Sequence, residues 1–193
     1  EHFMLKEMYE QPKAIMDTFS PRIKKNEIVI EELNMTDEEI KDIRKIMIVA
    51  CGSAYHAGVT GKYVFEGMSR IPVEVDLASE FRYRNPILDE GTLVIVISQS
   101  GETADSLAAL RESKEKGAKV LGIVNVVGSS IAREADNVMY TWAGPEIAVA
   151  TTKAYSSQLI ALYLLAIKFG RVKGTVTESQ VEEYIEGLKR LPE

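Results

Sequence analysis

The segment Ser98-Gln99-Ser100-Gly101-Glu102-Thr103 brings three hydroxyl groups and a glycine together within one short turn. It follows the apolar run Thr92 to Ile97 and precedes a helical pattern. A helix N-terminus offers unpaired N–H groups and a partial positive charge to an anion, and hydroxyls add further donors. Because no Lys or Arg lies between Ser98 and Leu110, neutral dipoles would have to hold that anion. The segment predicts a phosphate cradle, with helix capping by Ser100 or Thr103 as the alternative.

A second turn of similar character, Cys51-Gly52-Ser53-Ala54, follows the apolar run Ile46 to Ala50. Carboxyl ends of parallel strands meet at one edge of a sheet, so both turns are expected to face the same crevice. Cys51 is interpreted as a small residue at a strand end, because a nucleophilic thiol needs a neighbouring base. The only histidines are His2 and His56, and His56 is expected to pack or to be solvated.

A third turn, Val149-Ala150-Thr151-Thr152-Lys153, opens a long apolar helical pattern. Thr151 or Thr152 could line a site or simply cap this helix, and the pattern leaves both open. The sequence contains no Walker loop, no G-x-G-x-x-G fingerprint, no H-E-x-x-H pair and no G-x-S-x-G elbow. We therefore expect no cofactor, no metal and no serine hydrolase chemistry.

Five β-branched runs, separated by longer helical patterns, would position these turns. This alternation is typical of βαβ units with a parallel sheet, and the most apolar run should be a central strand covered by helices on both faces. The sequence predicts an α/β fold, a three-layer αβα sandwich around a five-stranded parallel sheet. The predicted strands are Ile46 to Ala50, Val73 to Leu77, Thr92 to Ile97, Val120 to Val124 and Asn137 to Thr141.

Bulk composition bounds the class of protein. The 193 residues are 46% hydrophobic and 27% charged, with a formal net charge of −6 from mixed acidic and basic residues. This balance excludes a clustered basic surface for nucleic acid. The longest apolar stretch, Leu159 to Ile167, is far below the ~20 residues that span a bilayer, so no membrane association is expected. A single cysteine and the lack of a signal-peptide pattern at the start favour the cytoplasm. The start at Glu1 also suggests an excised piece of a longer protein.

The three turns, together with Lys6 to Pro12 and Ala78 to Arg84, resemble the first sugar isomerase (SIS) subdomain of the glutamine:fructose-6-phosphate amidotransferase (glucosamine-6-phosphate synthase) family. The resemblance covers essentially the whole chain and implies a flavodoxin-like, doubly wound sheet. It divides the chain into a helical preface, 1–45, an SIS domain, 46–170, and a C-terminal linker and helix, 171–193. The implied parent is an enzyme of hexosamine biosynthesis that converts fructose 6-phosphate and glutamine to glucosamine 6-phosphate and glutamate.

The resemblance also implies the site residues. Ala54 stands where family members often carry a serine, so one hydroxyl contact is lost there. No catalytic residue can be assigned, because the isomerisation residues of the family lie in its second SIS subdomain. The implied phosphate-binding residues are Ser98, Gln99, Ser100 and Thr103, and the implied sugar-binding residues are Cys51, Gly52, Ser53, Val149 and Thr151.

The partners implied are fructose 6-phosphate, glucose 6-phosphate or glucosamine 6-phosphate, the glutaminase and second SIS domains of the parent chain, and a second copy in a homodimer. The isolated chain is expected to bind hexose 6-phosphate without full catalysis. Aldose–ketose interconversion needs a base beside the sugar. Glu146, just before the third turn, is the one carboxylate considered for that role, although a solvated loop residue is the simpler interpretation. The alternatives are a non-catalytic phosphosugar sensor and a stand-alone phosphosugar isomerase.

Overall fold

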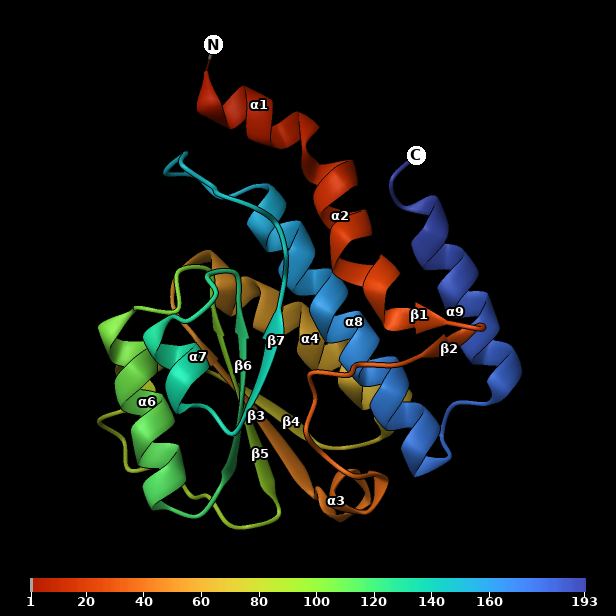
Figure 1. Ribbon diagram of the computed structural model, residues 1–193. Coiled ribbons are helices and arrows are strands. Elements are labelled where there is room, and N and C mark those ends of the chain that lie inside the picture. The colour runs from red at the N-terminus through yellow and green to blue at the C-terminus, as the bar shows by residue number, and fades with distance from the viewer. Residues whose placement is uncertain (1) are drawn as a thin grey trace.

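The computed structural model describes residues 2–193 and shows a parallel sheet between two layers of helices (Figure 1). The five strands run in the order β4-β3-β5-β6-β7, which is the 2-1-3-4-5 order of flavodoxin-like doubly wound folds. The predicted three-layer fold is confirmed, and each predicted strand lies within one residue of its observed bounds. These strands are β3 (Lys45–Ala50), β4 (Val73–Leu77), β5 (Thr92–Ser98), β6 (Lys119–Val124) and β7 (Asn137–Tyr140).

The two faces of the sheet bury different sets of side chains. In β5, Leu93, Ile95 and Ile97 point to one face and Val94 and Val96 to the other, because successive side chains of a strand alternate. All are fully buried, which confirms β5 as a central strand. The first face packs on α4 (Ser53–Ser69) and α8 (Lys153–Lys173), and the second on α5 (Ala78–Phe81), α6 (Ala104–Glu115) and α7 (Ser130–Glu134).

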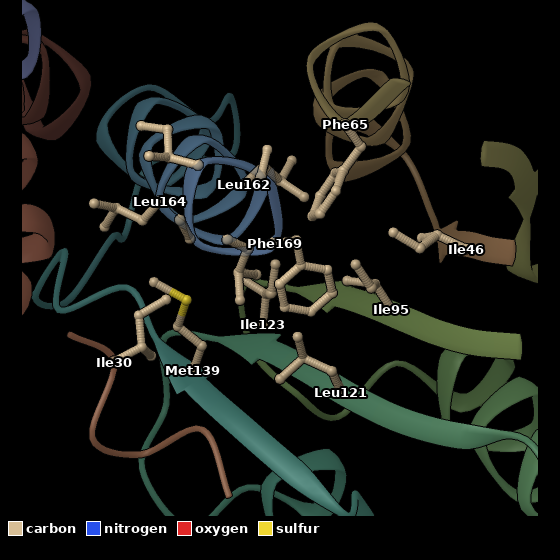
Figure 2. Packing of buried hydrophobic residues seen from close by; sticks show 14 of the residues in the cluster. Ile30, Ile46, Phe65, Ile95, Leu121, Ile123, Met139, Leu162, Leu164 and Phe169 are labelled. Carbon is tan, nitrogen blue, oxygen red and sulfur yellow. The ribbon is translucent and has the colours of Figure 1, made fainter. Parts of the chain in front are cut away.

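Large side chains from α4 and α8 fill the core on the first face (Figure 2). Phe65 of α4 and Phe169 of α8 are both fully buried, with ring centroids 5.7 Å apart in an edge-to-face arrangement. Ile95 and Leu121 of the sheet lie beneath them. The packing of Phe65 against Phe169 holds α8 on the sheet. It therefore also sets the position of the turn that precedes α8.

The residues before the sheet form a preface that packs on α8. Its helices are α1 (Phe3–Tyr9), α2 (Gln11–Phe19), the 3-10 turn η1 (Ser20–Arg22) and α3 (Asp37–Asp42). Pro12 occupies the first turn of α2, and a capping box opens α3, with Glu39 N donating to Thr36 Oγ1 at 3.2 Å. An antiparallel hairpin of β1 (Ile23–Lys24) and β2 (Glu27–Ile28) lies between η1 and α3, and the sequence analysis did not predict it.

The last helix, α9 (Glu178–Arg190), covers α8. Its Val181, Ile185 and Leu188 are buried, because their spacing places them on one face of the helix. The preface, the sheet and α9 contribute to one continuous hydrophobic cluster. The three-part division of the chain remains a prediction, and α8 runs past its second boundary to Lys173. Within residues 2–193, α8 and every other helix are too short or too polar to cross a bilayer.

Candidate sugar-phosphate site

A pocket of about 230 Å³ lies at the carboxyl ends of β3 and β5. Chain connections leave these two adjacent strands in opposite directions, so the pocket lies at the topological switch point where doubly wound folds bind ligands. The pocket includes every predicted site residue except Gly52 and Val149. Its lining consists of Cys51, Ser53, Ala54, Ile97, Ser98, Gln99, Ser100, Thr103, Thr151 and Gln158.

The Ser98–Thr103 turn, called here the phosphate loop, is closed by its own hydroxyls. Ser98 Oγ accepts a hydrogen bond from Gly101 N at 3.0 Å and lies 3.2 Å from Thr103 Oγ1. Gly101 has a φ of +67°, and a Cβ at this position would lie 2.1 Å from Ser129 Oγ. Glycine is therefore required here by both conformation and space.

The N-terminus of α6 opens behind this loop. Thr103 is its N-cap residue, yet the hydroxyl forms no capping bond to the first turn and contacts Ser98 instead. Ser100 Oγ accepts from Glu102 N at 3.2 Å, and Glu102 precedes the helix. The capping alternative is therefore wrong for both residues. The positive end of a 12-residue helix is left without a side-chain cap, as an anion site requires.

The Cys51-Gly52 turn presents a second helix N-terminus to the same pocket. Gly52 caps α4 with a φ of +56° and a ψ of −135°, which is a glycine conformation, and no side chain caps that helix. Cys51 Sγ lies 3.9 Å from Ser106 Oγ, a poor base. His56 is exposed and packs its ring against the edge of Tyr55, which confirms that it is solvated. Cys51 thus lines the pocket without an activating base.

Glu146 caps α8 from outside the helix. Its Oε1 accepts from Thr151 Oγ1 at 2.6 Å, and its Oε2 accepts from Thr152 N at 3.2 Å and Ala154 N at 3.0 Å. The interpretation of Glu146 as a freely solvated residue is therefore wrong. The threonine-cap alternative also fails, because Thr152 Oγ1 is buried with no partner among the described residues. A carboxylate at this helix end repels anions, so a phosphate belongs at α6 and α4 instead.

The charged side chains around the pocket point elsewhere. Glu102 accepts from Ser130 N at 2.8 Å, and the hydrogen bonds of Ser130 hold the pKa of Glu102 below its ordinary value. Arg82 bonds to Asp105 at 2.7 Å, and this bond raises the pKa of Arg82. No Lys or Arg appears in the lining drawn from residues 2–193. An anion in this pocket would therefore be bound by neutral hydroxyl and amide groups, as the sequence predicts.

Two predicted site residues lie at the margin. Gly52 shapes the turn but does not line the pocket, and the side chain of Val149 is fully exposed. Their contact with a sugar remains a prediction. Conversely, Gln158 of α8 lines the pocket, is 4% exposed, and its side chain makes no hydrogen bond with residues 2–193. Only its position seven residues, or two helical turns, after Thr151 could have signalled it.

A larger groove of about 450 Å³ lies between the β1–β2 hairpin, α3, α8 and α9. Its charges compensate one another: Lys168 pairs with Asp37 at 3.3 Å, and Arg171 pairs with Glu178. Within the described residues its lining contains no residue of the five-stranded sheet, and the two helix N-termini at the groove, those of α3 and α9, are closed by capping boxes. The smaller pocket is therefore the better candidate site for an anion, because two helix N-termini without side-chain caps and several hydroxyls face it.

Comparison with known proteins identifies the family of this chain. The family model described as "SIS domain" matches residues 39–168. The glutamine–fructose-6-phosphate aminotransferase (isomerizing) of Caldanaerobacter subterraneus is 63% identical over all of this chain, which covers 32% of that protein. The corresponding protein of Methanosarcina mazei is 51% identical, with 31% of it covered. The chain therefore spans about a third of the length of these curated relatives.

Solved structures show the same similarity. The C-terminal domain of glucosamine-fructose-6-phosphate aminotransferase from Francisella tularensis superposes with a TM-score of 0.95 and 41% identity, covering 100% of this chain and 54% of that one. A glucosamine-6-phosphate deaminase from Thermotoga maritima superposes with a TM-score of 0.73 and 26% identity, covering 99% of this chain and 54% of that one.

Proposed function

The chain belongs to the SIS domain family, and from this premise we propose that it is the sugar-phosphate-binding part of a glutamine–fructose-6-phosphate aminotransferase. Its proposed ligand is fructose 6-phosphate, with glucose 6-phosphate and glucosamine 6-phosphate as related guests. Relatives bearing that enzyme name are aligned over the whole chain at up to 63% identity among those compared. The proposed partners in the parent protein are a glutaminase domain, a second SIS domain and a second subunit, and the proposed location is the cytoplasm.

The observation that carries the proposal is the phosphate loop at the open end of α6. Ser98, Ser100 and Thr103 surround the N-terminus of a helix that no side chain of residues 2–193 caps. A phosphate there would accept hydrogen bonds from hydroxyls and backbone amides together, and the helix dipole would favour its charge. Because the pocket holds no Lys or Arg, binding is expected to be weak and readily reversible.

The opposite wall of the pocket suits the sugar. Ser53, Thr151 and Gln158 present two hydroxyls and an amide, and these groups exchange hydrogen bonds with sugar hydroxyls as donors and acceptors. A hexose 6-phosphate can therefore lie with its phosphate at α6 and its ring toward α8. Orientation of this kind lowers the barrier of a reaction whose base lies elsewhere.

Among residues 2–193, no carboxylate or histidine lines the pocket to serve as a base for isomerisation. Moving a proton between C1 and C2 of the sugar requires a positioned base. Glu146, the carboxylate closest in sequence to the pocket residue Thr151, already accepts three hydrogen bonds at the start of α8. We therefore expect the chain to orient the substrate while the base comes from another part of the parent protein.

Calorimetric titration of the 193-residue chain with fructose 6-phosphate tests the proposal, with fructose as the ligand lacking phosphate. We expect millimolar binding of fructose 6-phosphate and none of fructose. Replacing Ser100 and Thr103 by Ala should weaken binding at least about tenfold, since each hydrogen bond to a charged group contributes about 1.5–3 kcal/mol. Thr60→Ala removes a hydroxyl on α4 that bonds to His56 O and should leave affinity unchanged. A folded chain that gives no response at millimolar fructose 6-phosphate would refute the proposal.

A further inference from the structure

Glu7 of α1 reaches across the molecule to the loop that leads into α8. Its Oε1 accepts from Ile147 N at 2.7 Å, and its Oε2 accepts from Ala148 N at 3.2 Å. The residue is 2% exposed although it lies on a helix whose apolar side chains are largely in solvent. Figure 1 shows α1 beside this loop, residues 141–152, called here the β7–α8 segment.

Because Glu7 is buried, its carboxylate must be compensated by nearby hydrogen-bond donors. A buried carboxylate is costly unless it is paired or fully hydrogen-bonded. Glu7 forms no ion pair with residues 2–193, so the amides of Ile147 and Ala148 are its compensation. Moving the loop away from Glu7 would therefore be costly, because it would leave a buried carboxylate without hydrogen-bond donors.

Two further contacts join the preface to the start of α8. Lys153, which is 4% exposed, bonds to Glu10 at 2.6 Å, and Ser156 Oγ donates to Gln11 Oε1 at 2.6 Å. All three contacts link positions about 140 residues apart. They come from the α1–α2 junction and converge on the segment that carries Thr151.

Several contacts hold the β7–α8 segment: Asn125 bonds to Ala143 N and Gly144 O near its start, and two carboxylates hold the part that leads to Thr151. Glu7 fixes Ile147 and Ala148, and Glu146 fixes Thr151 at the other end. Only Val149 and Ala150 lie between these anchors. Since Thr151 lines the pocket, the placement of Glu7 determines where the sugar wall stands relative to the phosphate loop.

We propose that Glu7 is a positioning residue for the sugar end of the site, so that the helical preface takes part in hexose recognition. This inference rests on the proposed function, because it assumes that the pocket holds a hexose phosphate. Glu7 acts through the β7–α8 segment and has no contact with the pocket itself. None of the hydrogen bonds that hold the phosphate loop involves Glu7: the loop is closed by its own hydroxyls and attached to the residues after β6, where Ile131 N donates to Gly101 O at 3.0 Å.

The test compares fructose 6-phosphate with inorganic phosphate as probes of the 193-residue chain. Glu7→Ala should weaken fructose 6-phosphate binding about tenfold, a loss equivalent to ~1.4 kcal/mol, and leave inorganic phosphate binding unchanged. Glu7→Gln should restore part of the affinity, because its amide oxygen still accepts from a loop N–H. The matched control is Glu31→Ala, which removes an exposed carboxylate paired with Lys24 on the hairpin. It should alter neither affinity.

The outcomes separate the two claims. Unchanged fructose 6-phosphate affinity in Glu7→Ala, or an equal loss for both probes, would overturn the positioning role alone. No binding of fructose 6-phosphate by the unsubstituted chain would contradict the proposed function and the positioning role with it. If Glu7→Ala fails to fold, Glu7→Gln supplies the comparison. Hydrogen exchange at the Ile147 and Ala148 amides should then be faster in Glu7→Gln, and unchanged exchange together with unchanged affinity would overturn the role.

Discussion

The phosphate loop and the β7–α8 segment line the same pocket but are held in different ways. Ser98 secures the loop through Gly101 and Thr103, its neighbours in sequence. The β7–α8 segment depends on Glu7, which lies 140 residues away. The phosphate loop is thus closed by local hydrogen bonds and attached to the residues that follow β6, because Asn125 N and Ile131 N donate to Gln99 O and Gly101 O. The sugar end depends instead on the helical preface, which is much farther away in sequence. Substitutions should separate these two ends.

The largest effect is expected at Gly101 of the phosphate loop. Gly101→Ala places a Cβ 2.1 Å from Ser129 Oγ and a side chain at a φ of +67°. Strain and overlap should lower the free energy of unfolding by at least about 2 kcal/mol and abolish phosphate binding. Chemical denaturation measures the first and calorimetry the second.

Gly67→Ala is the matched control for this substitution. Gly67 lies within α4, and a Cβ there would meet nothing within 4 Å. Alanine should stabilise the helix by ~1 kcal/mol and leave binding intact. If Gly101→Ala behaved like Gly67→Ala, the loop would not have the local rigidity that we ascribe to it.

A smaller effect is expected at Gln158 on the sugar side. Its amide is 4% exposed and unpaired among the described residues, so a sugar hydroxyl would be its partner. Gln158→Ala should weaken fructose 6-phosphate binding several-fold, as loss of ~1 kcal/mol implies, without changing the affinity for inorganic phosphate. Parallel calorimetric titrations measure both ligands. Equal weakening of both would place Gln158 at the phosphate end instead.

The smallest effect is expected on the pKa of Glu10, which joins the preface to α8 through Lys153. The hydrogen bond from Lys153, and then that from Lys6, holds the pKa of Glu10 below its ordinary value of 4.5. The stabilisation from Glu10 is therefore complete above pH 4.5 and is lost as the pH falls through its lowered folded pKa. Lys153→Met should raise the pKa of Glu10 toward the ordinary value and reduce this acid loss.

NMR titration of the Glu10 side-chain carboxyl carbon measures that pKa directly. Lys13→Met provides the control, because Lys13 is exposed and pairs with Asp17. It should leave the pKa of Glu10 where it was. An unchanged pKa in Lys153→Met would show that the Lys153 contact does not hold the preface against α8 in solution.

The same contrast explains what the sequence could predict. The strands β3 to β7 could be predicted because a buried parallel strand is a run of consecutive apolar residues. The phosphate loop was found because its hydroxyls, its glycine and the following helix are adjacent in the chain. The hairpin at Ile23 to Ile28 was missed because its strands have two residues each and its turn, Lys25-Asn26, adopts positive φ without a glycine.

The sugar end was predicted less completely because its determinants are distant in sequence. Thr151 was identified from its turn, but the alternatives for Glu146 and Thr152 could be resolved only by seeing which oxygen accepts the α8 amides. Gln158 lies in no recognised motif, and the segment Lys6 to Pro12, which contains Glu7, indicated the family but no role for that carboxylate. Their roles arise from burial and from contacts that helix packing creates, and these are not encoded in neighbouring residues.

Amide chemical-shift mapping with fructose 6-phosphate tests the central claim most directly, because it reports every part of the pocket at once. We predict saturable shifts at Ser98 to Thr103 and at Gly52 to Ala54, smaller shifts at Thr151 and Gln158, and none in the groove around Lys25 and Arg171. Inorganic phosphate should shift Ser98 to Thr103 but neither Thr151 nor Gln158. Shifts confined to the groove, or none at millimolar sugar phosphate, would contradict the assignment of this pocket.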